Sequence, residues 1–430
     1  MKPLALLLLC CSTWAGAQEL PAARLKLSPA LAPSPASTTV RAIRFEGNEV
    51  TQPRTMLREM VIAPGDLADP ARIERSRQAV QDLGLFKSVS VREEPVNGGV
   101  DLVFKVRERW YLLPIPRLDA KATGEYSYGG QVRWNNVWGL DHTLRLTYER
   151  EDRQKQGVGL ETSYNFGYSA PQVFDSRYSV GIGAGHTRRP RILPDGRSYE
   201  EQLQNIGVGI SRSLSEGPPS QGWSVSAGLL WQDQDTSGVN AIAPYGMATA
   251  PELGLRYRDL HLRIYSEEGI SYGGKLQFAV DGWAADYGYS ELTAGYAQYI
   301  PVGSTEYQTL HLFAELGLRS DGPPLNDAFT LGGNSLLRGY EKDFLEGDAV
   351  YRVAAEFARP VFRRWLRWVL IAEAGSVFEE PDDIRFGRVY TSVGAALRVR
   401  FSTFVNLEIE AGVALPVGDD GGLRFFAGRI

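Results

Sequence analysis

From residue 111 to the C-terminal residue, apolar and polar residues alternate along about sixteen segments, and turn residues separate each segment from the next. In 310–319, for example, Leu310, Leu312 and Leu316 alternate with His311 and Glu315. Because successive side chains of a strand point to opposite faces, each segment would have one apolar face and one charged face. No stretch after residue 17 approaches a run of about 18 apolar residues, which excludes membrane-spanning helices.

Two-faced strands in such number are typical of a membrane barrel, in which the apolar set faces lipid and the charged set faces inward. The segment 404–417 repeats the pattern, with Val405 and Ile409 on one face and Glu408 and Glu410 on the other. A soluble β-sandwich would place its apolar faces in a core instead. The sequence therefore predicts a mainly β protein, with a transmembrane β-barrel of about sixteen antiparallel strands over residues 109–430.

The N-terminus has the features of a secretory signal over residues 1–17, with Lys2, a short apolar run at 4–9 and Ala-Gly-Ala at 15–17. Cys10 and Cys11 offer lipidation as an alternative, but Leu9 is bulkier than the small residue that a lipoprotein signal has before its cysteine. Residues 18–39 are rich in Pro, Ala and Ser and predict a flexible linker.

Composition argues against several classes of function. Both cysteines lie in the predicted signal, so the mature chain would have no disulfide, thiolate metal site or cysteine nucleophile. Removal of Lys2 leaves 45 of the 46 basic residues against 51 acidic ones, which gives no reason to invoke nucleic acid. The four histidines have no metal-ligand spacing; they are His142, His186, His261 and His311.

Signals for catalysis are also weak. The one G-x-S-x-G match, at 269–273, falls on an alternating segment expected to be a strand, so it is not the strand-to-helix elbow that carries a nucleophilic serine. The carboxylates of Glu408 and Glu410 could imitate an acid/base pair, but neighbouring charges are common inside barrels. We therefore expect no enzymatic activity, no cofactor and no metal, with a barrel-borne hydrolase as the alternative.

Residues 40–108 predict a small α/β domain of order β-α-α-β-β. A strand ends at the turn Gly47-Asn48, and a helix begins at Asp69 and Pro70. Gly84 ends that helix, and alternating strands follow at 86–93 and 100–106. The strand that contains Phe86, Val89 and Val91 is a candidate edge, whose free backbone groups could pair with an extended peptide.

This domain resembles a POTRA domain in two stretches, Ile-Arg-Phe-Glu-Gly-Asn at 43–48 and Leu-Gly-Leu-Phe-Lys-Ser-Val at 83–89. Arg338-Gly339-Tyr340 is similar to a loop motif that plugs the lumen in the same superfamily. Ala-Gly-Ser-Val-Phe at 374–378 resembles the strand motif that faces this loop, with Glu373 where the family usually has Asp. The chain is thus identified as a member of the Bam/Tam-type assembly and secretion barrels (the bacterial surface antigen family), with a single POTRA domain.

The turn-rich insertion 320–347 carries the Arg-Gly-Tyr motif, and alternation in the strands around it suggests where the arginine docks. In 350–358 the apolar residues alternate so that Glu356 points inward, and in 366–374 the same argument turns Glu373 inward. A guanidinium between two carboxylates in a partly dry lumen can make bidentate hydrogen bonds. We therefore predict that Arg338 latches the loop to Glu356 and Glu373, with Gly339 and Tyr340 beside it.

The first and last strands of the barrel form a second candidate site. Pro114 and Pro116 lie two residues apart, so both lack an N–H toward the same neighbour. The opposing C-terminal segment contains Gly422 and Gly428. These residues predict a weak lateral seam, unless Pro114 and Pro116 belong to the linker before the barrel.

The resemblance implies a location in the bacterial outer membrane, with the POTRA domain in the periplasm. It implies that the protein assembles or secretes unfolded polypeptides, with the lipid bilayer and periplasmic chaperones or accessory proteins as partners. Two alternatives stay open: a passive channel or translocation pore, and a barrel that anchors a partner protein.

Overall fold

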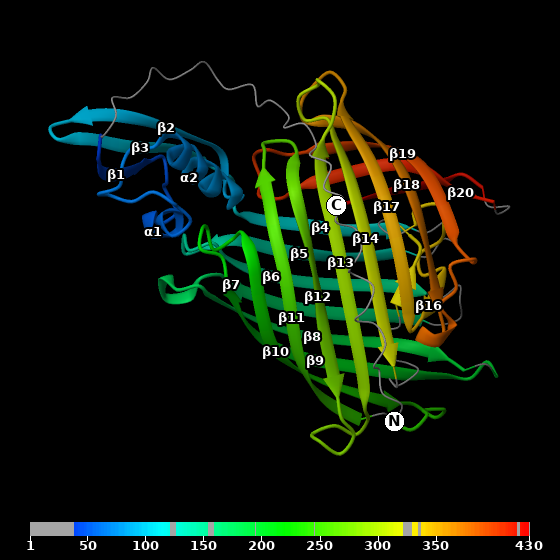
Figure 1. Cartoon of the computed structure of the whole chain (residues 1–430). Coiled ribbons are helices and arrows are strands. Elements are labelled where there is room, and N and C mark those ends of the chain that lie inside the picture. The colour runs from blue at the N-terminus through cyan, green and yellow to red at the C-terminus, as the bar shows by residue number, and fades with distance from the viewer. Residues whose placement is uncertain are drawn as a thin grey trace. The chain divides into compact units, whose positions relative to one another are not determined.

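Sixteen strands form one antiparallel sheet in which each strand pairs with its neighbours in chain order, from β4 to β21 (Figure 1). Only β15 and β16 fall outside this order, because they pair with each other instead. The predicted fold of sixteen antiparallel strands is confirmed. The strands of the large sheet are β4 (Leu112–Ala120), β5 (Tyr126–Val137), β6 (His142–Arg153), β7 (Gly159–Ala170), β8 (Tyr178–Ile192), β9 (Ser198–Ser213), β10 (Gly222–Ser237), β11 (Gly246–Leu262), β12 (Glu267–Ala279), β13 (Tyr289–Pro301), β14 (Thr309–Ser320), β17 (Ala349–Pro360), β18 (Leu366–Phe378), β19 (Tyr390–Arg400), β20 (Glu408–Val417) and β21 (Arg424–Arg429).

The computed structural model describes residues 38–120, 126–153, 159–193, 195–244, 246–320, 329–333, 337–418 and 422–429. The predicted signal 1–17 and the predicted linker up to residue 37 lie outside the described residues. Residues 39–430 belong to one compact unit. Short 3₁₀ turns occur at Val173–Asp175 (η2) and Pro381–Asp383 (η3).

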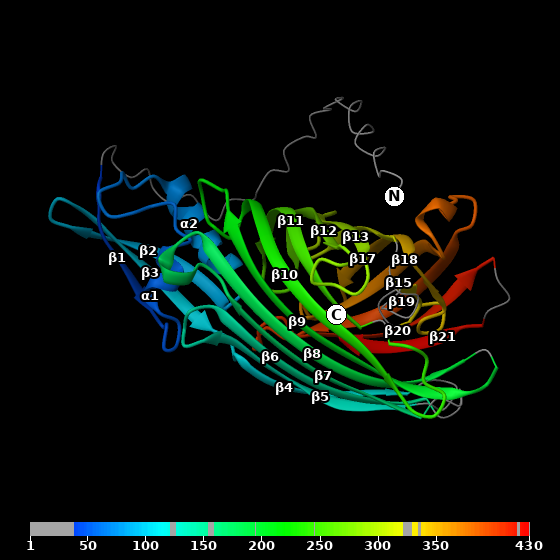
Figure 2. The ribbon, with the colours of Figure 1, turned by 90° about the horizontal axis from the view of Figure 1, so that it is seen from below.

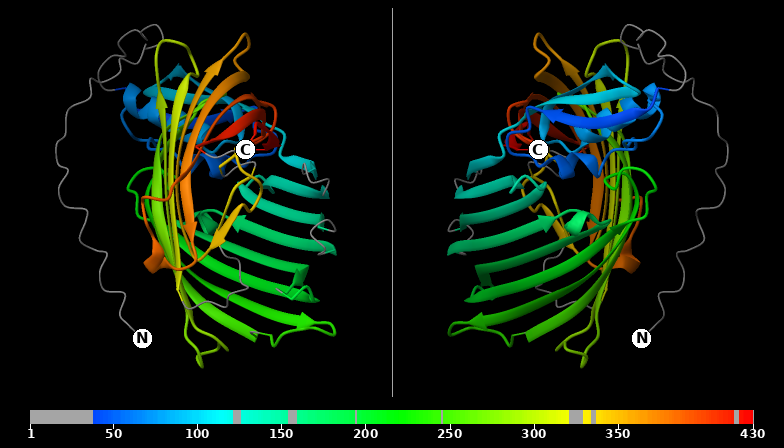
Figure 3. Two further views of the ribbon diagram at one scale, coloured as in Figure 1. Left: turned by 90° about the vertical axis from the view of Figure 1, so that its right-hand side faces the viewer. Right: turned by 90° about the vertical axis from the view of Figure 1, so that its left-hand side faces the viewer.

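The two faces of the large sheet differ as the alternation predicts. In β19 and β20, Leu397 and Ile409 are exposed on the outer face, whereas Arg398 and Glu410 are buried on the opposite face. The sheet curves so that this second face lies inside (Figure 3), and we call it the lumen face. One boundary was predicted wrongly: β20 begins at Glu408, and Val405 packs instead in the core of the N-terminal domain.

The N-terminal domain has the predicted order of elements, β1 (Val40–Glu46), α1 (Pro53–Leu57), α2 (Pro70–Asp82), β2 (Phe86–Val96) and β3 (Gly99–Glu108). β3 lies between β1 and β2, parallel to β1 and antiparallel to β2. Asp69 caps α2 by accepting a hydrogen bond from the Ala71 backbone. Among the described residues, no helix is long and apolar enough to cross a membrane.

Gly47 shows why the first turn of this domain requires glycine. Its φ of +85° is left-handed, and a Cβ at this position would lie 2.3 Å from the carbonyl oxygen of Val106. Asn48 stabilises the following residues because its side-chain amide donates to the Thr51 carbonyl oxygen at 3.0 Å. Gly84, after α2, also has a left-handed φ of +73°.

Besides the turn that contains Val405, four further turns of the large sheet contact the N-terminal domain among the described residues. The backbone amide of Gln52 donates to Gly139 in the β5–β6 turn at 2.9 Å. Glu59 is fully buried and accepts hydrogen bonds from Gln172, after β7, and from the Ser220 hydroxyl, before β10. Asp82 accepts from the Leu262 backbone amide at the end of β11 at 2.7 Å. The domain is therefore joined to the edge of the sheet at which these turns lie.

The insertion between β14 and β17 folds against the lumen face. β15 (Phe329–Leu331) and β16 (Leu345–Gly347) form a short antiparallel pair within it, drawn in yellow inside the curve of the sheet (Figures 2 and 3). Its buried apolar residues Leu331, Leu337 and Tyr340 form a cluster with side chains of β18 and β19. This cluster holds the Arg-Gly-Tyr motif beside the wall.

Candidate functional site

The backbone of the loop places Arg338 against the lumen face. Leu337 has a left-handed φ of 61° and is buried, which turns the chain toward the wall just before the arginine. Gly339 follows, and a Cβ there would lie 2.7 Å from the Leu415 carbonyl carbon and 2.8 Å from the Pro416 nitrogen. Glycine is therefore required for this close approach to β20. The ring of Tyr340 packs edge-on against Tyr390 of β19.

Arg338 binds both predicted carboxylates. Its Nη1 donates to Oε1 of Glu373 and its Nη2 donates to Oε1 of Glu356, each at 2.8 Å. Its backbone amide also donates to Oε2 of Glu373, at 2.7 Å. All three side chains are more than nine-tenths buried. The structure thus brings Arg338, Glu356 and Glu373 together in the arrangement that the sequence predicts.

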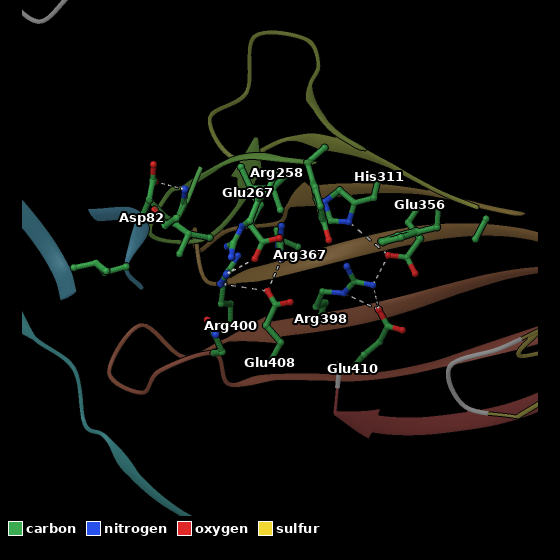
Figure 4. A pocket seen from close by; sticks show the side chains of 18 of the residues that line it. Asp82, Arg258, Glu267, His311, Glu356, Arg367, Arg398, Arg400, Glu408 and Glu410 are labelled. Atoms are coloured by element: carbon green, nitrogen blue, oxygen red, sulfur yellow. Dashed lines mark hydrogen bonds and ion pairs between the residues drawn. The ribbon is translucent and has the colours of Figure 1, made fainter. Parts of the chain in front are cut away.

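A second arginine completes the cluster. Arg398 of β19 is buried and contacts both Glu356 and Glu410, at 2.7 Å and 2.6 Å (Figure 4). Glu410 lies directly opposite Arg398 in the β19–β20 pairing and also reaches Arg338 at 3.4 Å. Two guanidinium groups therefore share three carboxylates. We call Arg338, Arg398, Glu356, Glu373 and Glu410 the latch cluster.

Burial makes the latch cluster sensitive to the loss of any member. Charged hydrogen bonds are strong when desolvated, but removal of one partner leaves an uncompensated buried charge. Further contacts hold the carboxylates in place: the Ser392 hydroxyl donates to Glu373 at 3.0 Å, and His311 lies 3.6 Å from Glu356. On the other side, the guanidinium of Arg338 lies 5.5 Å from the ring centroid of Phe426 in β21.

Sequence reasoning missed the role of Arg398 and of His311. Both lie on the polar phase of their strands, so alternation alone would have turned them inward. Their pairing with Glu410 and Glu356 depends on strand register, which alternation does not specify.

The ends of the large sheet form the second site. Among the described residues, β4 and β21 are its terminal strands and are not paired with each other. Pro114 and Pro116 lie within β4, opposite Val132 and Gly130 of β5, so they belong to the first strand and not to the linker. Gly428 lies in β21 opposite Glu410, whereas Gly422 lies outside β21. Its assignment to the seam strand was wrong because β21 begins only at Arg424.

The two prolines face the unpaired edge of β4. The Asn135 amide donates to the Tyr111 carbonyl oxygen at 2.8 Å, so residue 111 directs its backbone groups toward β5. Because this orientation alternates along a strand, Leu113 and Ile115 also face β5, and Pro114 and Pro116 face away from it. The free edge of β4 therefore lacks two backbone donors, which is where proline is tolerated in a sheet.

Hydrogen bonds attach one end of this edge to the turn between β19 and β20. Trp110, just before β4, forms an isolated parallel bridge with Phe404, in the turn between β19 and β20. The Trp110 amide donates to the Thr403 carbonyl oxygen at 2.7 Å. Arg133 of β5 adds a side-chain bond to the Asn406 carbonyl oxygen at 2.9 Å. The beginning of β4 is thus attached to the turn before β20.

The predicted edge of the N-terminal domain is partly occupied. β2 is an edge strand of its sheet, but Phe86 and Val89 are buried and their carbonyl oxygens accept bonds from Gln81 and Arg77. Val91 is half-buried. Because residues two apart direct their backbone groups the same way, Val91 continues the edge beyond the part that Arg77 covers.

Charged groups outside the strands also respond to burial. Burial, and secondarily the positive charge of Arg400, lower the pKa of Arg109 to about 10. Burial raises the pKa of Asp141, in the β5–β6 turn, to about 7, with Arg58 opposing the shift. Among the described residues, no cluster of His, Cys, Asp and Glu could hold a metal ion. The latch cluster and the Asp141 turn both line one cavity of about 640 Å³.

Two family models match the chain. The Omp85 superfamily domain matches residues 136–428, and the POTRA model, described as a surface antigen variable number repeat, matches residues 38–109.

Curated relatives are more distant. "Outer envelope protein 80, chloroplastic" from Oryza sativa subsp. japonica is 23% identical and shares 71% of this chain and 48% of its own length. "Outer membrane protein assembly factor BamA" from Neorickettsia risticii (strain Illinois) is 26% identical, over 35% of this chain and 20% of its own. The chain therefore spans about half, or less, of the length of these relatives.

Solved structures share the fold. CdiB from Escherichia coli superposes with a TM-score of 0.65 at 15% identity, covering 91% of this chain and 75% of that one. BamA from Haemophilus ducreyi lacking POTRA domains 1–3 gives 0.55 at 18% identity, covering 91% and 84%. At these identities the likeness concerns the fold alone.

Proposed function

The chain belongs to the Omp85 superfamily, and from this premise we propose that it assembles proteins into the bacterial outer membrane or secretes them across it. In this proposal the sixteen-stranded barrel spans the outer membrane and the POTRA domain lies in the periplasm. The substrates are unfolded polypeptides, which periplasmic chaperones or accessory proteins deliver. The protein is not an enzyme and needs no cofactor, because strand pairing and burial of the substrate supply the free energy.

The observation that carries the proposal is the unpaired edge of β4. An edge strand presents backbone groups that can pair with another chain. Here the carbonyl oxygens of Pro114 and Pro116 face the edge, but neither residue offers an N–H. An added strand can therefore donate hydrogen bonds at these positions but cannot accept them. Such incomplete pairing favours a strand that arrives and later leaves.

The edge of β2 in the POTRA domain supports an earlier step. Its first residues are covered by Arg77 and Gln81, so the edge near Val91 is the part on which an extended polypeptide can add. In this proposal the substrate pairs there first and reaches the edge of β4 afterwards, while the latch cluster braces the lumen.

A photo-crosslinking experiment in growing cells tests the proposal. A photoreactive amino acid replaces Leu112 at the start of β4 or Phe425 in β21, both of which have exposed side chains. The matched control replaces Leu255, which is also exposed but lies in β11, between two paired neighbours. We expect adducts with newly exported outer-membrane or secreted proteins at Leu112 and Phe425 and not at Leu255. Equal adducts at all three positions, or adducts at none, would refute substrate pairing at the seam.

A translocation pore is the second candidate function, favoured by the cavity of about 640 Å³ on the lumen face. In planar bilayers, a pore would give large conductance that increases when the Arg338 loop is undocked. An assembly factor is expected to conduct little and to change outer-membrane protein content when it is depleted. An anchoring barrel would do neither, and its depletion would release one partner protein.

A further inference from the structure

Arg367, the first lumen-facing residue of β18, is buried with two of its side-chain nitrogens lacking hydrogen-bond acceptors. Its side chain is 1% exposed, and its Nη2 donates to Oε1 of Glu408 at 2.7 Å. Its Nε and Nη1 have no hydrogen-bond partner among the described protein atoms. It is the one arginine of the described residues with two such buried atoms.

Arg400 approaches the same carboxylate. Its Nε lies 3.6 Å from Oε1 of Glu408, the oxygen that Arg367 binds, and this Nε is also without a hydrogen-bond partner among the described protein atoms. Its Nη2 bonds Glu267 of β12 at 3.0 Å. Figure 4 shows Arg367 and Arg400 on either side of Glu408, within the cavity that both residues line.

A third guanidinium group lies near Arg367 and Arg400. Arg367 and Arg400 face the carboxylates of Glu408 and Glu267, and Arg109 adds a third guanidinium close enough to Arg400 for its pKa to be lowered. The side chain of Arg109 bonds the carbonyl oxygens of Phe86 and Phe404, so its own charge is not matched by a carboxylate. Three guanidinium groups therefore lie near two carboxylates here, whereas in the adjoining latch cluster two guanidinium groups share three carboxylates.

The register of β18 and β19 places a second arginine beside Arg367. Arg367 lies directly opposite Arg398 in the β18–β19 pairing. Like charges in this position destabilise a sheet. Arg398 is matched by Glu356 and Glu410 in the latch cluster, so these carboxylates do not serve Arg367. A bound ligand that accepts hydrogen bonds from Arg367 would offset this unfavourable contact.

A buried donor without a partner destabilises the fold, and more strongly when the group is charged. An oxyanion can satisfy several of these charged donors at once, because the planar or tetrahedral arrangement of its oxygens matches the fork of a guanidinium.

We propose that Arg367 and Arg400 form a binding site for a small oxyanion of the carboxylate or phosphate type, next to Glu408 in the lumen cavity. Arg367 supplies Nε and Nη1, and Arg400 supplies Nε. The anion is either a free phosphate or the terminal carboxylate of a polypeptide in the lumen. The site does not depend on the proposed transport function, since it rests on the contacts of these side chains alone.

Calorimetric titration of the purified full chain in detergent, at neutral pH and constant ionic strength in chloride, tests the site. The probes are inorganic phosphate, an N-acetylated tripeptide with a free terminal carboxylate, and the same tripeptide with an amidated terminus. We expect phosphate or the free-carboxylate peptide to bind and the amidated peptide not to bind. Phosphate alone identifies a free anion as the ligand, and the free-carboxylate peptide identifies a polypeptide end.

Two variants locate the binding. Arg367→Gln removes the charge and is expected to weaken binding at least about tenfold, or about 1.4 kcal/mol. Arg352→Gln is the matched control, because Arg352 also lines the cavity but bonds Glu315 at 2.6 Å, away from Glu408. Binding that survives in Arg367→Gln overturns the proposal, as does the absence of binding of every probe to the unmodified chain. Should Arg367→Gln fail to fold, anomalous scattering from selenate soaked into crystals of the unmodified chain decides: a peak beside Arg367 supports the site and its absence refutes it.

Discussion

Glu373 accepts two hydrogen bonds from Arg338, one on each carboxylate oxygen. The guanidinium Nη1 binds Oε1 at 2.8 Å and the backbone amide binds Oε2 at 2.7 Å. One residue of β18 therefore fixes both the side chain and the backbone of the loop. This explains how a loop with only a short strand pair of its own is held to the wall.

Arg338→Ala should destabilise the folded barrel by about 3–5 kcal/mol, because it leaves Glu356, Glu373 and Glu410 with one buried arginine among them. Arg338→Lys should destabilise the barrel by less than Arg338→Ala, because lysine keeps the positive charge but lacks the forked donors of the guanidinium. Urea unfolding of refolded protein in lipid vesicles measures both. Arg352→Ala is the control. This variant should lose no more than about 1 kcal/mol of stability, because Glu315, the partner of Arg352, is half exposed. Equal losses in the two alanine variants would contradict a special role for the latch cluster.

Gly339→Ala should displace the loop from β20, because the added Cβ would meet Leu415 and Pro416 at under 3 Å. Crowding of this kind costs about 1–3 kcal/mol. The rate of limited proteolysis between β14 and β17 is expected to rise. Gly295→Ala, in β13, is the matched control, since a Cβ there meets no atom within 4 Å. Unchanged proteolysis in Gly339→Ala would show that the close approach does not hold the loop.

Replacing Pro114 and Pro116 together by alanine should allow β4 to pair with β21, because the unpaired edge of β4 gains two donors. Each new hydrogen bond contributes about 0.5–1.5 kcal/mol. Hydrogen exchange in β4 and β21 should slow, and crosslinking of substrate at Leu112 should fall. Pro251→Ala is the control, because Pro251 lies in β11, away from the seam, opposite Leu229 of β10. Faster exchange at the seam in the double variant is the outcome that this reasoning does not allow.

Asp141 predicts a pH dependence. Burial, with a contribution from Glu59, raises its pKa from 3.8 to about 7 in the folded protein. Between these values the folded state holds the proton more tightly than the unfolded chain, so stability is greater at low pH and falls as pH rises to about 7. Asp141→Asn should remove this fall and stabilise the protein at neutral pH. Thermal unfolding across this pH range measures it, with Asp175→Asn, an exposed aspartate at the β7–β8 turn, as control. A fall that persists in Asp141→Asn would assign the effect to another group.

Alternation was sufficient to predict the strands and the inward direction of Glu356 and Glu373, because side-chain direction in a strand depends only on position parity. It was insufficient for contacts between strands. Arg398 meets Glu410 because β19 and β20 pair in one register, and a shift by one residue would turn one of the two outward. The same limit applies to Val369 and Ile371, apolar residues that pack on the lumen face beside Phe426.

Contacts between the POTRA domain and the turns were beyond sequence reasoning. Glu59 has no local signal that marks it as buried, and its partners Gln172 and Ser220 are more than a hundred residues away. Val405 illustrates the same point, because its alternation fits a strand but it packs against the POTRA core. The alternation of apolar and polar residues describes one strand at a time, whereas the burial of these residues depends on contacts between two domains.

Phe426 lies against the guanidinium of Arg338, although one belongs to the last strand and the other to the loop. Within the described residues, the backbone of β21 is paired with β20 alone, so this side-chain contact adds to the attachment of the strand. A cation–π contact of about 1 kcal/mol would make loop undocking and strand release favour each other by about fivefold, and linkage makes this effect reciprocal. An incoming polypeptide that displaces β21 would thereby favour undocking of the Arg338 loop. Strand exchange at the end of the sheet would then open space on the lumen face.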